Sequence, residues 1–345
     1  MARIAFEDFA SGAAFTYAGP TVSRDDIVAF AREYDPQPFH VDEEAARKGF
    51  FGTLVGSGWH ACALMMRIIA DAVLLDSTSM GAPGIEETRW LTPLRPGDTL
   101  RVRQTILETK ASRSRPEMGL VHMRTELLNQ DEAPILEQTN WSMFGRRGAE
   151  IAPFETDRPR PAPGAPLATP GVPGPSYPPP LQPEADAAPY FEDLEIGKIS
   201  ELGAYGFAAD DTVAFARRFD PQPFHVDVDA ARRSHFGELC ASGWHTGAVW
   251  MKMIVQHRKR VVDAARAAGA APAQLGPSPG FKNLRWSKPV YVGDTITYRS
   301  VVADKRPTAS RPEWGLVFSR NSGTNQRGEE VFSFDGCAFW QRRPA

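Results

Sequence analysis

The stretch Asp35-Pro36-Gln37-Pro38-Phe39-His40 occurs a second time, without a change, as Asp220-Pro221-Gln222-Pro223-Phe224-His225. In each copy two prolines stiffen the segment between a carboxyl and an imidazole that lie five positions apart. The stretch can therefore hold both groups towards one point, which indicates an acid/base pair. A turn that caps a helix is the plainer interpretation. The identity continues through Asp42 and Asp227 while the surrounding sequence differs, and this favours function.

The rest of the chain repeats with the same spacing. At an offset of 185 residues, Phe6-Glu7-Asp8 aligns with Phe191-Glu192-Asp193 and Gly58-Trp59-His60 aligns with Gly243-Trp244-His245. The offset later becomes 196, because the second copy holds an eleven-residue insertion between positions 257 and 280. A repeat of this length predicts two copies of one domain, at residues 1–152 and 190–345.

Residues 153–189 between the copies hold 13 of the 30 prolines of the chain, together with Gly, Ala and Ser. This composition cannot form a core and favours an extended linker. A linker of this length lets the second copy lie beside the first. We therefore expect a pseudo-dimer within one chain, and a homodimer of whole chains stays open.

Each copy predicts the same order of elements. Ser23 is expected to cap a first helix, with Asp26 at its third position, and Asp210 takes the capping place in the second copy. Ser57 precedes a long apolar helix from position 58 to about 75, and its counterpart runs from 243 to about 262. Strands are expected at 15–22, 87–91, 99–110, 120–129 and 135–144, and at 280–286, 295–304, 315–321 and 331–341. One buried helix followed by antiparallel strands predicts an α+β fold in which the sheet curls around the helix, formed twice.

Composition restricts the class of protein. The 345 residues are 42% apolar and 23% charged, with a net charge of -3, which is typical of a globular protein and leaves no basic surplus for nucleic acid. The apolar segment 59–75 is too short and too interrupted to span a bilayer. The N-terminal residues lack the apolar run of a signal peptide, and the three cysteines form no framework. We expect a cytoplasmic protein with no nucleic-acid or membrane partner.

The motif and its surroundings resemble one family. The Asp-x-x-Pro-x-His spacing, a glycine eighteen residues after the histidine at the start of an apolar helix, and the turn Pro96-Gly97-Asp98 resemble the MaoC-like dehydratases and (R)-specific enoyl-CoA hydratases of the hot-dog fold. The resemblance covers both copies and leaves out the linker. It implies a double hot-dog fold and two catalytic pairs, Asp35 with His40 and Asp220 with His225. It also implies that the backbone N–H of Gly58 or Gly243 faces the thioester oxygen.

The chemistry fits these residue types. Adding water across a double bond conjugated to a thioester needs a base for the water, an acid for the α-carbon and a donor for the enolate oxygen. An aspartate, a histidine and a helix N-terminus supply these three. The sequence does not decide which of the two side chains is the acid and which is the base.

Further residues are assigned to the substrate or to the core. Trp59 and Trp244 follow the glycines and could either shorten an acyl pocket or pack in the core. His60 and His245 are expected to be packing residues or neighbours of the site. Arg113, Arg115 and Arg311 are expected in solvated turns, with contact to coenzyme A phosphates as the alternative. The residues expected at the substrate are Phe39, Ser57, Trp59, Phe224, Ser242 and Trp244.

The sequence thus predicts a hydro-lyase that hydrates a trans-2-enoyl thioester or dehydrates the (R)-3-hydroxyacyl thioester. The thiol carrier is coenzyme A or acyl carrier protein, the acyl group is short or branched, and both copies are expected to be competent. No metal is expected, because His60 and Cys62 lie two apart on a helix and diverge. No cofactor is expected beyond the carrier. A hot-dog thioesterase and a non-catalytic acyl-thioester binding module remain as alternatives.

Overall fold

A computed structural model describes residues 3–151 and 189–344, so that the predicted linker at 153–189 lies outside the described residues except for Pro189. Each copy contributes five strands. Those of the N-terminal copy are β1 (Ala14–Thr21), β2 (Gly84–Trp90), β3 (Thr99–Ala111), β4 (Met118–Leu128) and β5 (Pro134–Gly145). Those of the C-terminal copy are β6 (Ile199–Gly206), β7 (Gly280–Trp286), β8 (Thr295–Pro307), β9 (Trp314–Asn325) and β10 (Glu330–Gln341).

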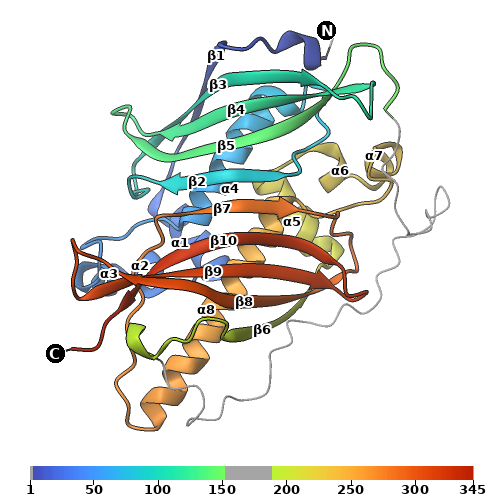
Figure 1. Cartoon of the computed structure of the whole chain (residues 1–345). Coiled ribbons are helices and arrows are strands. Elements are labelled where there is room, and N and C mark those ends of the chain that lie inside the picture. Colours follow the sequence, from blue (N-terminus) through green and yellow to red (C-terminus); the bar gives the residue numbers. More distant parts are fainter. Residues whose placement is uncertain (1–2, 152–188, 345) are drawn as a thin grey trace.

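The ten strands form one antiparallel sheet in the order β1-β3-β4-β5-β2-β7-β10-β9-β8-β6 (Figure 1). The two copies meet where β2 pairs with β7. At this junction the backbones approach closely, because a Cβ atom added at Gly84 would lie 2.1 Å from Leu284 O. The copies therefore lie side by side as halves of one sheet.

The helices lie behind the sheet in Figure 1. The principal helix of the N-terminal copy contacts β1, β3 and β5, and that of the C-terminal copy contacts β6. Each copy is therefore a sheet wrapped around one helix, and the predicted α+β double hot-dog fold is confirmed. In the N-terminal copy the helices are α1 (Arg24–Tyr34), α2 (Pro38–Val41), α3 (Glu43–Lys48) and α4 (Gly58–Ile69), which continues into η2 (Ala70–Leu74). In the C-terminal copy they are α5 (Ala209–Phe219), α6 (Pro223–Val226), α7 (Val228–Arg233) and α8 (Gly243–Ala267).

The helix starts follow the predicted caps with one exception. Ser23 and Asp26 form the expected capping box, and Ser57 Oγ accepts a hydrogen bond from the Trp59 N–H. The prediction for Asp210 is wrong, since α5 begins at Ala209 and Asp210 lies within its first turn. A carboxylate there still favours the helix, because it lies near the positive end of the helix dipole.

Helix α8 also ends later than predicted. It continues five residues past Val262, to Ala267, so part of the eleven-residue insertion lengthens the helix.

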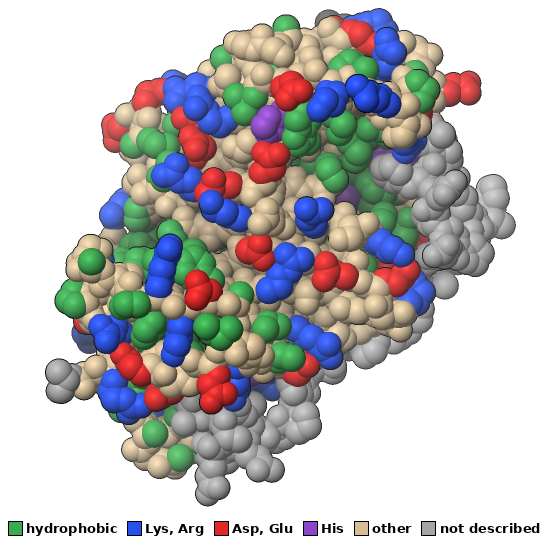
Figure 2. All heavy atoms as spheres, viewed as in Figure 1, with side chains coloured by type: hydrophobic (Ala, Val, Ile, Leu, Met, Phe, Trp, Pro, Cys, Tyr) green, Lys and Arg blue, Asp and Glu red, His purple; other side chains and the backbone are tan. Residues whose placement is uncertain are grey.

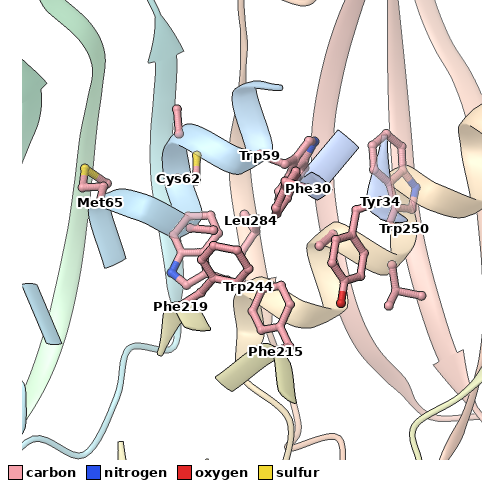
Figure 3. Close-up of a cluster of buried hydrophobic side chains, with 14 of the residues drawn as sticks. Phe30, Tyr34, Trp59, Cys62, Met65, Phe215, Phe219, Trp244, Trp250 and Leu284 are labelled. Atoms are coloured by element: carbon pink, nitrogen blue, oxygen red, sulfur yellow. The ribbon is translucent and has the colours of Figure 1, made fainter. Parts of the chain in front are cut away.

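The two copies share one apolar core. Side chains from α1, α4, α5 and α8 meet behind the central strands, as Figure 3 shows for Phe30, Trp59, Phe219 and Trp244. The Phe30 and Phe219 rings pack edge to face at 5.6 Å across the boundary between the copies. In the view of Figure 2, acidic and basic side chains are interspersed on the outside of the molecule. The copies are thus joined both by the sheet and by the core.

Candidate active site

The repeated motif is partly helical. Helix α1 ends at Tyr34, and Pro36 explains this end because the residue before a proline disfavours the helical conformation. Within the motif, α2 and α6 each form one helical turn that begins at a proline. Proline is suited to the first helical position, where its missing N–H has no partner to lose. Each histidine therefore lies on a short, fixed turn.

In the C-terminal copy, Asp220 and His225 face each other. The Asp220 Oδ2 to His225 Nε2 distance is 3.5 Å, and both side chains are buried. The Ser242 hydroxyl donates to Asp220 Oδ2 at 2.6 Å, and Gln222 Nε2 donates to Oδ1 at 2.9 Å. These two bonds hold the carboxylate in one orientation.

The backbone sets the tautomer of the histidine. His225 Nδ1 lies 2.8 Å from Cys240 O, and because a carbonyl oxygen only accepts, Nδ1 carries the proton. In the neutral ring, Nε2 is then unprotonated and directed at Asp220. This nitrogen is available as a base.

The N-terminal copy repeats this geometry. The Asp35 Oδ2 to His40 Nε2 distance is 3.3 Å, Ser57 donates to Asp35 at 2.6 Å and Gln37 donates at 2.8 Å. His40 Nδ1 donates to Val55 O at 2.7 Å. Ser57 and Ser242, predicted at the substrate, are thus bound to the aspartates and are fully buried. The glutamine contacts were not predicted, although both glutamines stand inside the repeated motif.

The glycines at the helix starts are required by packing. A Cβ atom at Gly243 would lie 2.3 Å from the Trp286 ring, whose Nε1 donates to Gly243 O at 3.0 Å. Trp90 packs on Gly58 in the same way. Within the described residues no acceptor takes the Gly243 N–H, so it is a free donor at the positive end of α8.

A cavity of about 850 Å³ lies between the copies. The C-terminal copy contributes Asp220, Phe224, His225, Gly243 and Trp244 to its lining. The N-terminal copy contributes an apolar wall that includes Met66, Ile69, Val73, Ile85 and Phe144. Five predicted site residues of the C-terminal copy therefore meet at one cavity.

The predicted site residues of the N-terminal copy do not line this cavity. The residues concerned are Phe39, Asp35, His40, Ser57, Gly58 and Trp59. Phe39 lies beside Phe51, with ring centroids 5.6 Å apart.

Aromatic side chains occupy the space beside Trp59. Its ring stacks on Phe281 at 5.1 Å and meets Phe334 at 5.7 Å. The ring of Trp250, which is labelled with Trp59 in Figure 3, lies 6.0 Å away. The positions equivalent to these three in the other copy hold Ile85, Gln138 and Met65, and the first two of these line the cavity. These smaller or more flexible side chains leave the cavity open on one side of the molecule, whereas the aromatic ones fill the other.

His60 and His245 are packing residues. Each ring stacks on a phenylalanine, Phe30 and Phe215 respectively, with centroids 4.5 Å apart. Burial lowers the pKa of both histidines to about 3, so both are neutral at physiological pH. They are therefore unsuited to proton transfer near neutral pH.

Arg113, Arg115 and Arg311, for which contact with coenzyme A phosphates was the alternative to solvated turns, do not line the cavity. Arg115 forms an ion pair with Glu117 at 2.7 Å, and Arg311 lies over the Phe50 ring at 4.2 Å. The cavity is instead lined by Lys288 and Arg327, which nothing in the sequence distinguishes.

These two cations share an acidic partner. Arg327 Nε lies 2.9 Å from Glu329 Oε2, and Lys288 also binds Glu329. Hydrogen bonds from Asn325, Lys288 and Arg327 lower the pKa of Glu329 to about 2. Glu329 is thus ionised and offsets part of the positive charge.

Comparison with known proteins gives the family. The family model described as "MaoC like domain" matches residues 10–126 and again residues 198–313. The chain belongs to the MaoC-like family. The 3-hydroxybutyryl-CoA dehydratase of Methylorubrum extorquens is 30% identical over 130 residues, which cover 35% of this chain and 69% of that protein.

Two further relatives extend the comparison. The uncharacterised protein YdeM of Bacillus subtilis is 29% identical over 131 residues, covering 38% of this MaoC-like chain and 92% of YdeM. A Mycobacterium tuberculosis protein described as having a double hotdog fold superposes with a TM-score of 0.67 at 16% identity, covering 98% of this chain and 99% of that one. The latter likeness concerns the fold alone.

Two other kinds of site are absent from the described residues. Across residues 3–151 and 189–344, no group of three or more His, Cys, Asp and Glu side chains could hold a metal ion. Among the helices of those same residues, none combines the length and the hydrophobicity needed to cross a bilayer.

Proposed function

We propose that this MaoC-like protein hydrates a trans-2-enoyl thioester, or dehydrates the (R)-3-hydroxyacyl thioester, at the Asp220–His225 pair. One observation carries the proposal: the pair, the free N–H of Gly243 and a cavity of about 850 Å³ coincide. A volume of this size accommodates a small-molecule ligand. The active site is then formed by both copies, with catalytic groups from one and the acyl pocket largely from the other.

The geometry supports a mechanism through a bound water. The 3.5 Å between Asp220 and His225 exceeds a normal hydrogen bond, which leaves both groups able to bind the same water molecule. The water oxygen bonds to the β-carbon as the double bond opens, and its proton passes to the pair. The pair returns a proton to the α-carbon from the same side. The enolate oxygen that forms between these events accepts a hydrogen bond from the Gly243 N–H.

The N-terminal pair is proposed to be structural. Asp35 and His40 have the same hydrogen bonds as their counterparts, but Trp59, Phe281 and Phe334 occupy the adjoining space. A structural role for this pair differs from the expectation that both copies are catalytically competent. Asp35 then serves to join α1 to the start of α4 through its bond to Ser57.

A coenzyme A thioester is the favoured substrate form. The dehydratase relative is named for a coenzyme A ester, and Lys288 and Arg327 at the cavity are about half exposed and suited to phosphate groups. An acyl carrier protein would present the same thioester on a protein surface. Turnover of the free coenzyme A ester tests this choice.

The matched aspartate variants test the site. Asp220→Asn is expected to lower kcat/KM for enoyl-CoA hydration by about 10²- to 10⁴-fold, because it removes a proton-transfer group. Asp35→Asn is the control and should stay within about threefold of the parent protein. The measurement is the loss of the conjugated enoyl-thioester absorbance with time.

Three results would count against the proposal. Equal losses of kcat/KM in the two variants would indicate two equivalent sites. Release of free thiol in step with the loss of the enoyl-thioester absorbance would identify a thioesterase, because hydration leaves the thiol bound. Binding of acyl-CoA without any turnover by the parent protein would identify a binding module.

A further inference from the structure

A row of uncharged polar side chains crosses the cavity wall. Gln104 on β3 pairs directly with Thr125 on β4, and Thr125 pairs with Gln138 on β5. Asn140 and Ser142 continue the row along β5, on the same face as Gln138 because they follow at every second position. All five line the cavity, and all except Ser142 are buried. We call these five residues the polar row.

The polar row is only partly satisfied by its own hydrogen bonds. Gln138 Nε2 donates to Asn140 Oδ1 at 3.1 Å, and Asn140 Nδ2 donates to Ser142 Oγ at 3.0 Å. Gln104 Nε2 donates to Thr125 Oγ1 at 3.3 Å and contacts Met123 Sδ. Gln104 Oε1 accepts from no donor of the described residues, and Gln138 and Asn140 each use one of their two side-chain N–H groups. The spare donors and acceptor belong to residues that face the cavity.

The fold itself does not require this row. The equivalent positions in the C-terminal copy hold Ser300, Asn321, Phe334, Gly336 and Ala338, so the part contributed by β10 is apolar. The inner face of a sheet in this position normally packs apolar side chains on a helix. Buried polar groups are costly unless they are hydrogen-bonded, so their partner must be water or a ligand in the cavity.

We infer that the acyl group of the substrate carries a neutral hydrogen-bonding substituent, a hydroxyl, carbonyl or amide, beyond the double bond, and that the polar row binds it. This inference rests on the proposed function, because it takes the cavity to be the acyl pocket of the Asp220–His225 pair. An alkyl chain would displace water from the amides of Gln104, Gln138 and Asn140 without replacing its hydrogen bonds. Sites built to bind a polar group discriminate strongly against ligands that lack it.

The substituent is neutral because the polar row contains no charged side chain. The cations that line the cavity, Lys288 and Arg327, lie in the C-terminal copy, outside the row, and are assigned above to the phosphate groups of coenzyme A. A carboxylate on the acyl group would therefore be desolvated at the row without a cation to pair with.

A substrate series tests the inference on the unaltered protein. Trans-2-enoyl-CoA esters of four to eight carbons are compared at each length with a terminal methyl, a terminal hydroxyl and a terminal carboxylate. At the best length, kcat/KM for the hydroxyl ester is expected to exceed that for the methyl ester by roughly 10- to 100-fold, with the carboxylate ester poorest. The inference is overturned if the methyl or the carboxylate ester is turned over as well as the hydroxyl ester at every length.

Variants of the polar row give a second readout. Gln138→Leu and Asn140→Leu should each reduce the preference for the hydroxyl ester by about tenfold, chiefly through its KM, since a buried hydrogen bond is lost. Asn321 is a buried polar residue on β9 of the C-terminal copy. Asn321→Leu is therefore the matched control and should leave the preference for the hydroxyl ester unchanged. An unchanged preference in both row variants would refute the role of the row.

A binding measurement separates this inference from the proposed function. Calorimetry with hydroxyl-ended and methyl-ended saturated acyl-CoA esters of matched length requires no turnover. Absence of hydration for every ester refutes the proposed function alone. Equal binding of the two saturated esters at every length refutes the inference alone.

Discussion

His245 and His225 show that the same residue type has different roles within one copy. The His245 ring stacks on Phe215, and neither ring nitrogen has a hydrogen-bond partner among the described residues. His225, nearby in the same copy, has its tautomer fixed by Cys240 O and faces a carboxylate. The second arrangement suits proton transfer, whereas the first only fills volume.

The buried histidines should make the protein sensitive to acid. The ordinary histidine pKa of 6.5 applies to the unfolded chain, and the pKa of His245 is about 3 in the folded protein, so the unfolded chain binds protons first as the pH falls. The stability that comes from keeping these histidines neutral is therefore fully present above pH 6.5 and is lost as the pH falls towards 3. At pH 5 each of His60 and His245 should lower the free energy of unfolding by about 2 kcal/mol.

His245→Phe keeps the ring stack and removes the titrating group. In urea unfolding at pH 7.5 and pH 5.0, this variant should lose about 2 kcal/mol less than the parent protein over that interval. An equal pH dependence in the two proteins would show that the His245 ring is protonated in the folded state.

At the scale of elements, the pairing of β2 with β7 controls how the copies join. Strand β2 was predicted from position 87 but begins at Gly84, where it already pairs with Arg285 of the other copy. Glycine is a poor predictor of a strand, but here it allows the two backbones to approach. The start of β2 is therefore decided by the partner strand.

Gly84→Ala should weaken this junction. Its Cβ atom would lie 2.1 Å from Leu284 O, and a backbone oxygen cannot move aside without disturbing the sheet. We expect a loss of about 1–3 kcal/mol in the free energy of unfolding. The control is Gly97→Ala, where the new Cβ meets nothing within 4 Å and only the positive φ of 91° opposes it. Denaturant melts that rank Gly97→Ala as the more destabilising change would contradict the steric argument.

At the scale of the whole molecule, the N-terminal copy supports the C-terminal pair across the boundary. Ser79 Oγ donates to Gln222 Oε1 at 3.0 Å, and the other end of the same amide donates to Asp220. His235 Nε2 lies 3.0 Å from Met80 O in the next residue of the same segment. Residues far from the motif in sequence thus orient its carboxylate.

Ser79→Ala should lower kcat for enoyl-CoA hydration by about fivefold, because the Gln222 amide loses a hydrogen bond worth about 1 kcal/mol that fixes its orientation. KM should change little if Ser79 acts only through Gln222. Ser278→Ala is the control, since its hydroxyl donates to Gly280 O and does not line the cavity. A change in KM alone would instead place Ser79 in contact with the substrate.

The sequence by itself determined the features that depend on local or periodic patterns. The tandem repeat, the alternating strands, the caps at Ser23 and Ser57 and the close pairing of each aspartate with its histidine all follow from spacing within a few residues, or from repetition. The interaction of Gln222 with Asp220 could have been predicted from the sequence, because the glutamine stands inside the repeated motif.

Only the tertiary structure decided which pair faces a cavity. The motifs of the two copies are identical, so no local pattern could separate them. The difference arises from Phe281, Phe334 and Trp250 around Trp59, where the equivalent positions of the other copy hold Ile85, Gln138 and Met65. These side chains come from strands and a helix far apart in sequence. Their volumes act on one another only after the sheet has brought the two copies together, and so the position of the open site is a property of the packed molecule.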